Sequence, residues 1–406
     1  MLFFESDYIG EVGLSNLKLY RYASVDKSPI SKYILKPYLD LVIEPFPLWM
    51  APNLITLCGF GFILINLTCV IIFIPDLVGP GAAWLYFSFA LGLWLYSTFD
   101  NIDGRQARRT GTSSPLGELF DHGCDALNCS LGAIVQSAAM GLGHSWYSAF
   151  LLVLTTAPFY ISTWEEYQTG VLYLGYVNGP TEGLITACIV MIISGILGPG
   201  FWKTDLHEFF GSKAPDFVQG YTLTDLMFAF ITTMVLTCLL PASFYNVYQA
   251  CRRQERSFLA TLPQHLSFAV YAVSGYLWLS SPYSSILEDQ HFILFALTTG
   301  IVFGRMATKI ILAHVTKTPF PMFTVQLIPL LVGAILANVP IVFHIDPILT
   351  PKIEYYYLLS YFVFVLIAYI YWAVIVIRQF CSYLKIRCLH IPHRQPESED
   401  DEAEIS

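Results

Sequence analysis

The sequence predicts an all-α protein that crosses a membrane many times. Of its 406 residues, 55% are hydrophobic and 13% are charged, whereas an average soluble domain carries about 25% charged residues. A helix needs about 20 mostly apolar residues to span a bilayer. About ten such runs occur, at residues 54–74, 82–106, 116–141, 145–166, 180–198, 222–248, 262–281, 291–314, 320–343 and 353–379.

The runs divide the chain into three regions. Residues 1–45 are expected to form a cytosolic or interfacial segment, 46–380 the transmembrane domain, and 381–406 an acidic, disordered cytosolic tail. Between Asn16 and Pro45, apolar residues alternate with lysine and arginine. This pattern is typical of an amphipathic helix on an anionic membrane surface, and a helix packed on the soluble side fits it equally well.

Lysine and arginine predict the orientation of the spans, because they favour cytosolic loops. One set of loops holds nearly all of them, at residues 18–36, 105–109, 252–256, 317 and 378–394, and the opposite set holds Lys203, Lys213 and Lys352. With an even number of spans, both termini face the cytosol. No basic stripe lies outside these short loops, so nucleic acid is not an expected partner.

Four aspartates stand out in the second and third runs: Asp100, Asp103, Asp121 and Asp125. Charged residues at membrane depth are costly and usually functional. Spacings of three and four residues place each pair on one helix face. The turn Thr110-Gly111-Thr112-Ser113-Ser114-Pro115 separates the pairs, with Ser114 as the expected N-cap. We therefore expect adjacent, antiparallel helices whose carboxylates face each other.

Facing carboxylates repel each other strongly at low dielectric, so they must be protonated or bind cations. Oxygen ligands suit Mg²⁺ or Mn²⁺, commonly completed by phosphate and water. Gly104 and Gly117 lie on the same helix stripes and leave space for such a ligand. The structural alternative is that Arg105, Arg108 and Arg109 neutralise the aspartates as ion pairs, which leaves the glycines unexplained.

The residues Asp100-x2-Asp103-Gly104-x2-Ala107-Arg108-x8-Gly117-x3-Asp121-x3-Asp125 match the signature of the CDP-alcohol phosphotransferases. The flanking segments 46–57, 114–125 and 162–170 resemble the eukaryotic, particularly the fungal, choline/ethanolamine phosphotransferases. The resemblance implies a catalytic core of six transmembrane helices within residues 46–380, with further helices packed around it.

The resemblance also implies an activity: phosphocholine or phosphoethanolamine passes from CDP-choline or CDP-ethanolamine to diacylglycerol, and CMP is released. By position, the four aspartates would hold two Mg²⁺ or Mn²⁺ ions, while Asn53, Gly104 and Arg108 would bind the CDP-alcohol. His122 matches a proposed proton acceptor. The family implies an endoplasmic reticulum membrane, or that of the Golgi, and a homodimer is a further expectation.

The residues themselves leave other roles open for some of these side chains. His122, with an ordinary pKa of about 6.5, suits a general base, but it could instead orient a ligand carboxylate, with Asp125 as the base. Asn53 could cap the first span. Glu182 could orient His122 or the acceptor hydroxyl, or merely favour a helix start. Glu165 and Glu166 could contact substrate, although a solvated helix end is the simpler reading.

Two other classes of protein also carry acidic residues in the membrane. A transporter would use intramembrane carboxylates and would more naturally show repeated halves or broken helices, which the sequence lacks. An intramembrane aspartyl protease would need a single aspartate pair. Within the resembling superfamily, inositol or a glycerophosphate is an alternative acceptor to diacylglycerol.

Overall fold

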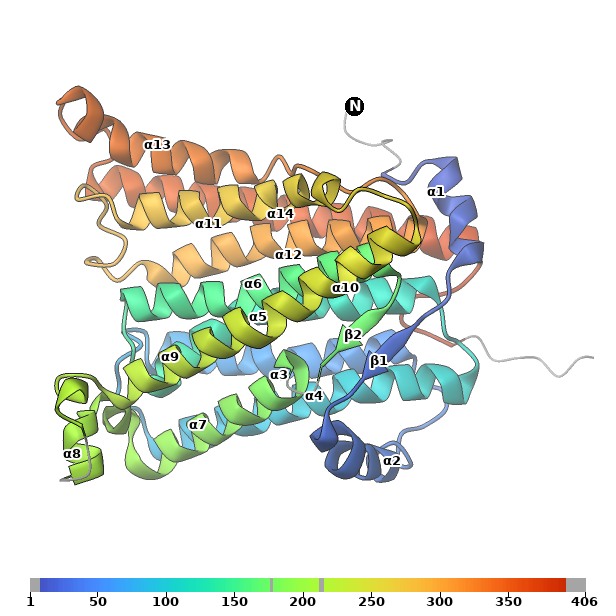
Figure 1. The fold of residues 1–406 in the computed structure, drawn as a ribbon, viewed down its shortest axis with the longest axis horizontal. Coiled ribbons are helices and arrows are strands. Elements are labelled where there is room, and N and C mark those ends of the chain that lie inside the picture. Colours follow the sequence, from blue (N-terminus) through green and yellow to red (C-terminus); the bar gives the residue numbers. More distant parts are fainter. Residues whose placement is uncertain (1–7, 176–177, 212–214, 392–406) are drawn as a thin grey trace, which may run out of the picture.

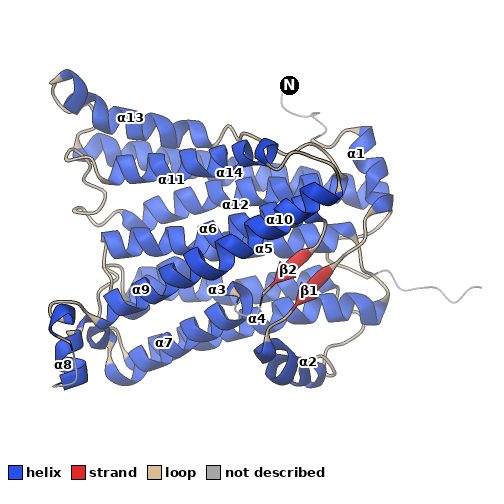
Figure 2. Ribbon diagram, viewed as in Figure 1, coloured by secondary structure: helices blue, strands red, loops and turns tan. Residues whose placement is uncertain are grey.

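The computed structural model describes residues 8–175, 178–211 and 215–391. Nearly all regular structure in these ranges is helical (Figure 2), which confirms the predicted all-α class. The long helices lie side by side in one bundle (Figure 1). They are α3 (Pro52–Phe73), α4 (Ala83–Thr110), α5 (Pro115–Met140), α6 (Trp146–Thr169), α7 (Leu184–Leu197), α9 (Leu223–Met234), α10 (Leu240–Arg253), α11 (Leu266–Leu279), α12 (Phe292–Thr316), α13 (Leu327–Phe343) and α14 (Pro351–Leu384).

Ten helical segments of the described chain coincide with the ten predicted runs. The short π-helix Val235–Leu239 joins α9 and α10 into one of them, and the π-helix Gly179–Gly183 leads into α7. Five segments are long and apolar enough to cross a membrane by length and composition: Pro52–Phe73, Gly179–Leu197, Leu223–Arg253, Phe292–Thr316 and Pro351–Leu384. Helices α4, α5 and α6 are as long but carry acidic side chains. The protein is therefore polytopic, and its most polar helices are the ones that hold the candidate site.

Helix α5 lies in the interior of the bundle, where it packs against α3, α6 and α12. Two glycines of α12 allow the close approach of these helices. A Cβ atom on Gly300 would lie 2.5 Å from Ser130 Cβ, and one on Gly304 would lie 2.6 Å from Leu127 Cδ2. Small residues at helix contacts let backbones approach closely. The contact with α12 thus fixes the position of α5, which bears Asp121 and Asp125.

The segment before the first span differs from the predicted single amphipathic helix. It forms α1 (Glu11–Asn16), a short strand β1 (Ser24–Asp26), a π-helical turn (Ser31–Leu35) and α2 (Lys36–Val42). Strand β1 pairs in parallel with β2 (Leu172–Leu174), which follows α6, with Val25 opposite Tyr173. The helical prediction is wrong at β1 because backbone pairing with β2 competes with helix formation. The segment therefore crosses one end of the bundle as a strap (Figure 1).

The short helix α8 (Leu206–Phe210) lies in the long connection between α7 and α9. Helix α14 continues to Leu384, beyond the predicted domain boundary at 380, and Cys388 lies beside Asn53 at the start of α3. The remainder of the predicted acidic tail, 392–406, lies outside the described residues.

Candidate active site

The turn between α4 and α5 positions the aspartates, and its helix end and N-cap are the predicted ones. Helix α4 ends at Gly111, whose φ of 67° is in the left-handed region that glycine tolerates. Ser114 then caps α5: its Oγ accepts a hydrogen bond of 3.2 Å from Gly117 N, and Pro115 occupies the first helical position. The two helices consequently run antiparallel, with their aspartates near the same end of the bundle.

Three of the four aspartates come together across the two helices. Asp100 of α4 and Asp121 and Asp125 of α5 each present a carboxylate oxygen, and these oxygens lie within 4.8 Å of one another. The Oδ1 atoms of Asp100 and Asp121 are buried and accept no hydrogen bond within the described structure. Asp125 Oδ1 accepts a hydrogen bond from the Tyr96 hydroxyl. Buried carboxylate oxygens without donors are the chemistry that a hard cation satisfies.

The fourth aspartate, Asp103, is held by the neighbouring helix. Its side chain is buried, and Oδ2 accepts a hydrogen bond from Thr56 Oγ1 of α3. Asp103 is not part of the group of three whose oxygens lie within 4.8 Å. The expected grouping is thus found for three of the aspartates, and the four-ligand assignment stays a prediction.

The nearby arginines do not neutralise these aspartates by ion pairing. Arg105 pairs with Asp40 of α2, and Arg109 Nη1 donates to the carbonyl oxygens of Ile43 and Phe46 at 3.0 and 2.9 Å. Arg108 is exposed and makes no ion pair in the described chain. The ion-pair alternative therefore fails for Arg105 and Arg109, while Arg108 remains free to meet a ligand.

Space beside the carboxylates is left by two glycines. A Cβ atom on Gly104 would meet only Arg108 Nη1, at 3.6 Å, and one on Gly117 would meet nothing closer than 3.8 Å. Neither glycine is therefore required for helix packing. Both glycines lie on the same helix faces as the aspartates and leave room there for a bulky ligand. Arg108 lies next to this space.

His122 lies between an aspartate and a glutamate. Its Nε2 is 3.9 Å from Asp121 Oδ2, and its Nδ1 is 3.8 Å from Glu166 Oε2. The expectation of a solvated end for α6 is wrong: Glu165 is 2% exposed and Glu166 is 4% exposed. Glu165 turns the other way and accepts a 2.7 Å hydrogen bond from Asn246 Nδ2. Of these two glutamates, for which the sequence leaves a substrate contact open, Glu166 is the one that lies beside His122.

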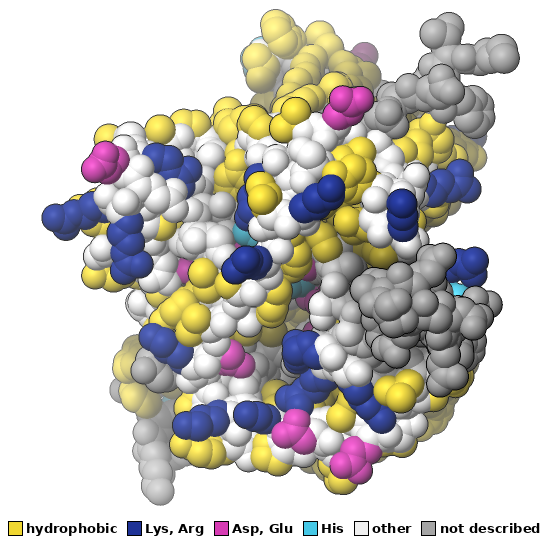
Figure 3. All heavy atoms as spheres, turned by 90° about the vertical axis from the view of Figure 1, so that its right-hand side faces the viewer, with side chains coloured by type: hydrophobic (Ala, Val, Ile, Leu, Met, Phe, Trp, Pro, Cys, Tyr) yellow, Lys and Arg dark blue, Asp and Glu magenta, His cyan; other side chains and the backbone are white. Residues whose placement is uncertain are grey.

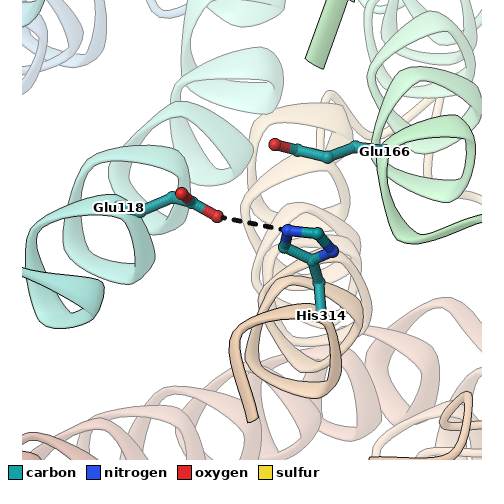
Figure 4. A group of neighbouring side chains, drawn as sticks. All are labelled: Glu118, Glu166 and His314. Carbon is teal, nitrogen blue, oxygen red and sulfur yellow. Dashed lines mark ion pairs between the residues drawn. The ribbon is translucent and has the colours of Figure 1, made fainter. Parts of the chain in front are cut away.

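A second polar cluster adjoins His122. Glu118 of α5, Glu166 of α6 and His314 of α12 are all buried and point toward one another (Figure 4). Glu118 Oε2 accepts a hydrogen bond from the hydroxyl of Tyr20, in the N-terminal strap. Burial, together with the neighbouring Glu118, raises the pKa of Tyr20 well above its ordinary value, so Tyr20 stays protonated and remains a donor.

Two predicted ligand-binding residues have other contacts. The N-cap of α3 is Ala51, without a side-chain cap, so the capping role for Asn53 is wrong. Asn53 is buried near Gly117, and its Nδ2 contacts Cys388 Sγ at 3.6 Å. Glu182 accepts hydrogen bonds from Ser28 Oγ and, at 2.8 Å, from Asn178 N. Its carboxylate ties the strap to the start of α7 instead of meeting His122.

The end of the bundle that carries the site is rich in basic residues. Figure 3 shows Lys and Arg side chains spread over this face, with acidic and histidine side chains visible in a recess among them. The basic residues include Arg108, Arg109, Arg252, Arg253 and Lys317, at the ends of α4, α10 and α12. This arrangement is suited to an anionic, water-soluble ligand that approaches from one side.

Fold and site together define a polytopic helical membrane protein with a partly buried carboxylate cluster that opens toward a basic face. Comparison with known proteins places it more narrowly. A model of the CDP-alcohol phosphatidyltransferase family matches residues 49–245, which contain the first five predicted spans, most of the sixth and all four aspartates. The chain belongs to this family of enzymes.

Relatives match nearly the whole chain. Choline/ethanolaminephosphotransferase 1 of Arabidopsis thaliana is 34% identical over 96% of this chain and 99% of the relative. Cholinephosphotransferase 1 of Saccharomyces cerevisiae is 38% identical over 78% of this chain and 81% of the relative. Ethanolaminephosphotransferase 1 of Homo sapiens is 29% identical over 94% of both. The helices beyond residue 245 are therefore shared with relatives that act on both alcohols.

Proposed function

We propose that this protein transfers phosphocholine, phosphoethanolamine or both from the CDP-alcohol to diacylglycerol, and releases CMP. The products would be phosphatidylcholine and phosphatidylethanolamine. The observation that carries this proposal is the group of neighbouring carboxylate oxygens of Asp100, Asp121 and Asp125 on the helices that match the family, two of them buried without a donor. The names of the relatives supply the substrates.

The aspartates would bind the cations that phosphoryl transfer needs. Asp100, Asp103, Asp121 and Asp125 would hold two Mg²⁺ or Mn²⁺ ions, and the unpaired Oδ1 atoms of Asp100 and Asp121 fit that role. Such ions, when bound, stabilise negative charge on phosphate oxygens and on the departing group. The remaining groups must bind the nucleotide and handle the proton.

The neighbouring side chains would position the CDP-alcohol. Exposed Arg108 would donate to phosphate oxygens, for which its planar guanidinium is suited. Gly104 leaves room for the phosphates next to the Arg108 side chain. Asn53, buried near Gly117, would contact the nucleotide through its amide. Glu182 has no place in this scheme because both of its oxygens already accept hydrogen bonds from Ser28 and Asn178.

His122 would accept the proton of the acceptor alcohol. The diacylglycerol oxygen attacks the β-phosphorus, the bond to the bridging oxygen breaks, and CMP leaves with that oxygen. Because Glu166 lies near Nδ1 of His122 and Asp121 near Nε2, either ring nitrogen has a carboxylate that stabilises the imidazolium formed. Histidine is the side chain that most often serves as general base in such a proton transfer.

CMP release tests the proposed reaction. The purified protein is incubated with Mg²⁺, diacylglycerol and either CDP-choline or CDP-ethanolamine, and CMP and phospholipid are measured in parallel. We expect equal amounts of both products. No CMP with any CDP-alcohol would favour a transporter, and CMP release that requires inositol or glycerol phosphate would move the protein to another acceptor class.

We also propose that the basic face, and with it the active site and both termini, lies on the cytosolic side of the endoplasmic reticulum membrane or, as the alternative, the Golgi. The concentration of Lys and Arg at that end supports the orientation (Figure 3). CDP-alcohol would enter from the cytosol and diacylglycerol from the surrounding bilayer lipids. A homodimer stays a prediction that cross-linking in native membranes can test.

A further inference from the structure

The cluster of Glu118, Glu166 and His314 has the composition of a cation site. The three side chains come from α5, α6 and α12, and they are 8%, 4% and 7% exposed. Each presents one ligand atom, and these atoms lie within 4.8 Å of one another. None of the three belongs to the four-aspartate motif. Figure 4 shows them converging on one point from three helices.

The three side chains are close without bonding directly to each other. Glu118 Oε1 is buried and accepts no hydrogen bond within the described structure, and it lies 3.9 Å from His314 Nε2. The Glu166 carboxylate, with its side chain 6% exposed, has His122 Nδ1 at 3.8 Å as its nearest basic atom. These separations are too long for hydrogen bonds. They therefore leave Glu118 Oε1 buried without a donor, beside the Glu166 carboxylate.

No lysine or arginine in the described ranges pairs directly with the carboxylates of the cluster, Glu118 and Glu166. Lys317, at the end of α12, is exposed, and its charge favours the ionised form of both glutamates without forming an ion pair. Burying two carboxylates without a direct ion pair is strongly unfavourable, so they must share a proton or bind a cation.

We propose that Glu118, Glu166 and His314 bind a divalent metal ion, separate from the ions at the aspartates. Bonds of about 2.0–2.2 Å to nitrogen and oxygen place ligand atoms up to about 4.4 Å apart, so small side-chain shifts suffice. A set of two carboxylates and one imidazole suits Mn²⁺ or Zn²⁺ better than Mg²⁺. The hydroxyl of Tyr20 holds the Glu118 carboxylate in place by donating a hydrogen bond to its other oxygen, Oε2.

A cation at this position would help to orient His122, because the two share Glu166 as a neighbour. Glu166 is shared: one side of its carboxylate faces the cluster, and Oε2 lies 3.8 Å from His122 Nδ1. A bound ion would hold Glu166 in place and thereby position His122. This role rests on the proposed function, whereas the binding of the ion does not.

Manganese binding with a nitrogen signature tests the site. The full-length protein is freed of metal with a chelator, loaded with Mn²⁺, and examined for bound ions per chain and for imidazole-nitrogen modulation in pulsed electron paramagnetic resonance. The four aspartates offer only oxygen, so His314 is the expected nitrogen ligand. We expect one ion fewer per chain, and loss of the nitrogen signal, in Glu166→Gln and in His314→Gln.

Two control variants make the result decisive. His265→Gln changes another partly buried histidine, outside the cluster, and should keep all ions and the signal. Asp121→Asn should lose ions at the aspartates but keep the nitrogen signal, so failure of the proposed function is distinguishable from failure of this site. Equal manganese binding and an unchanged nitrogen signal in His314→Gln would overturn the proposal. If that variant misfolds, a parent protein without nitrogen modulation overturns it as well.

Discussion

Replacing Asp121 by asparagine should affect activity and stability in opposite directions. The change keeps the shape of the side chain and removes one charge from a group whose oxygens lie within 4.8 Å of one another. At an effective dielectric of 20, two ionised carboxylates at that distance repel by about 3 kcal/mol. Asp121 has two such neighbours, Asp100 and Asp125, so without divalent cations the variant should unfold at a higher temperature than the parent.

With divalent cations present, we expect the effect of the substitution on stability to reverse. Asp121 would then contribute a ligand, so excess Mg²⁺ should raise the melting temperature of the parent more than that of Asp121→Asn. Turnover should fall about a thousandfold or more, which is the scale of losing charge stabilisation in phosphoryl transfer. The assay compares melting curves with chelator and with Mg²⁺, beside CMP release, and Asp40→Asn serves as an exposed control on a neighbouring element.

Activity of Asp121→Asn within about tenfold of the parent, a loss of only about 1.4 kcal/mol in transition-state stabilisation, would contradict the ligand role of Asp121. Stabilisation of the variant by Mg²⁺ as large as that of the parent would contradict it as well. A lower melting temperature in chelator would show that the carboxylate is held by partners within the protein instead of by cations.

Three further predictions concern the neighbours of the aspartates. His122→Ala should lose most turnover and still bind CDP-alcohol, measured by calorimetry; loss of binding would make His122 a substrate ligand. Arg108→Ala should raise KM for the CDP-alcohol about tenfold or more, as expected for one lost charge-assisted contact with phosphate, whereas an unchanged KM would remove it from the binding site. Gly104→Leu should block CDP-alcohol binding with little change in melting temperature, because no described atom but Arg108 Nη1 would meet its Cβ; normal binding would place the phosphates elsewhere.

The helices and the aspartate turn could be predicted because their signals are local. Apolar runs set the spans, and Gly111, Ser114 and Pro115 set the turn in agreement with the structure. Spacing placed Asp121 and Asp125 on one face of α5. The structure adds that Asp100 joins them, while Asp103 is bonded to Thr56 of a helix some 47 residues earlier in the chain.

The features that the sequence did not reveal depend on contacts between distant helices. Glu166 is buried because α6 packs against α5 and α12, and an acidic residue near a helix end gives no sign of that. His314 reads as an ordinary residue near the end of α12 until Glu118 is found 3.9 Å away. The strand β1 escaped prediction because its partner, β2, begins well over a hundred residues later. The hydrogen bond from Ser28 to Glu182 could not be predicted either, because it forms only where the strap crosses the start of α7.

The most direct measurement is the location of manganese in the protein soaked with Mn²⁺ and a CDP-alcohol, from anomalous scattering at the manganese edge. We expect two strong peaks between α4 and α5, each within bonding distance of oxygens from Asp100, Asp103, Asp121 or Asp125, with the nucleotide phosphates beside them. Carboxylates that turn away from one another, without a manganese peak between the two helices, would contradict this expectation.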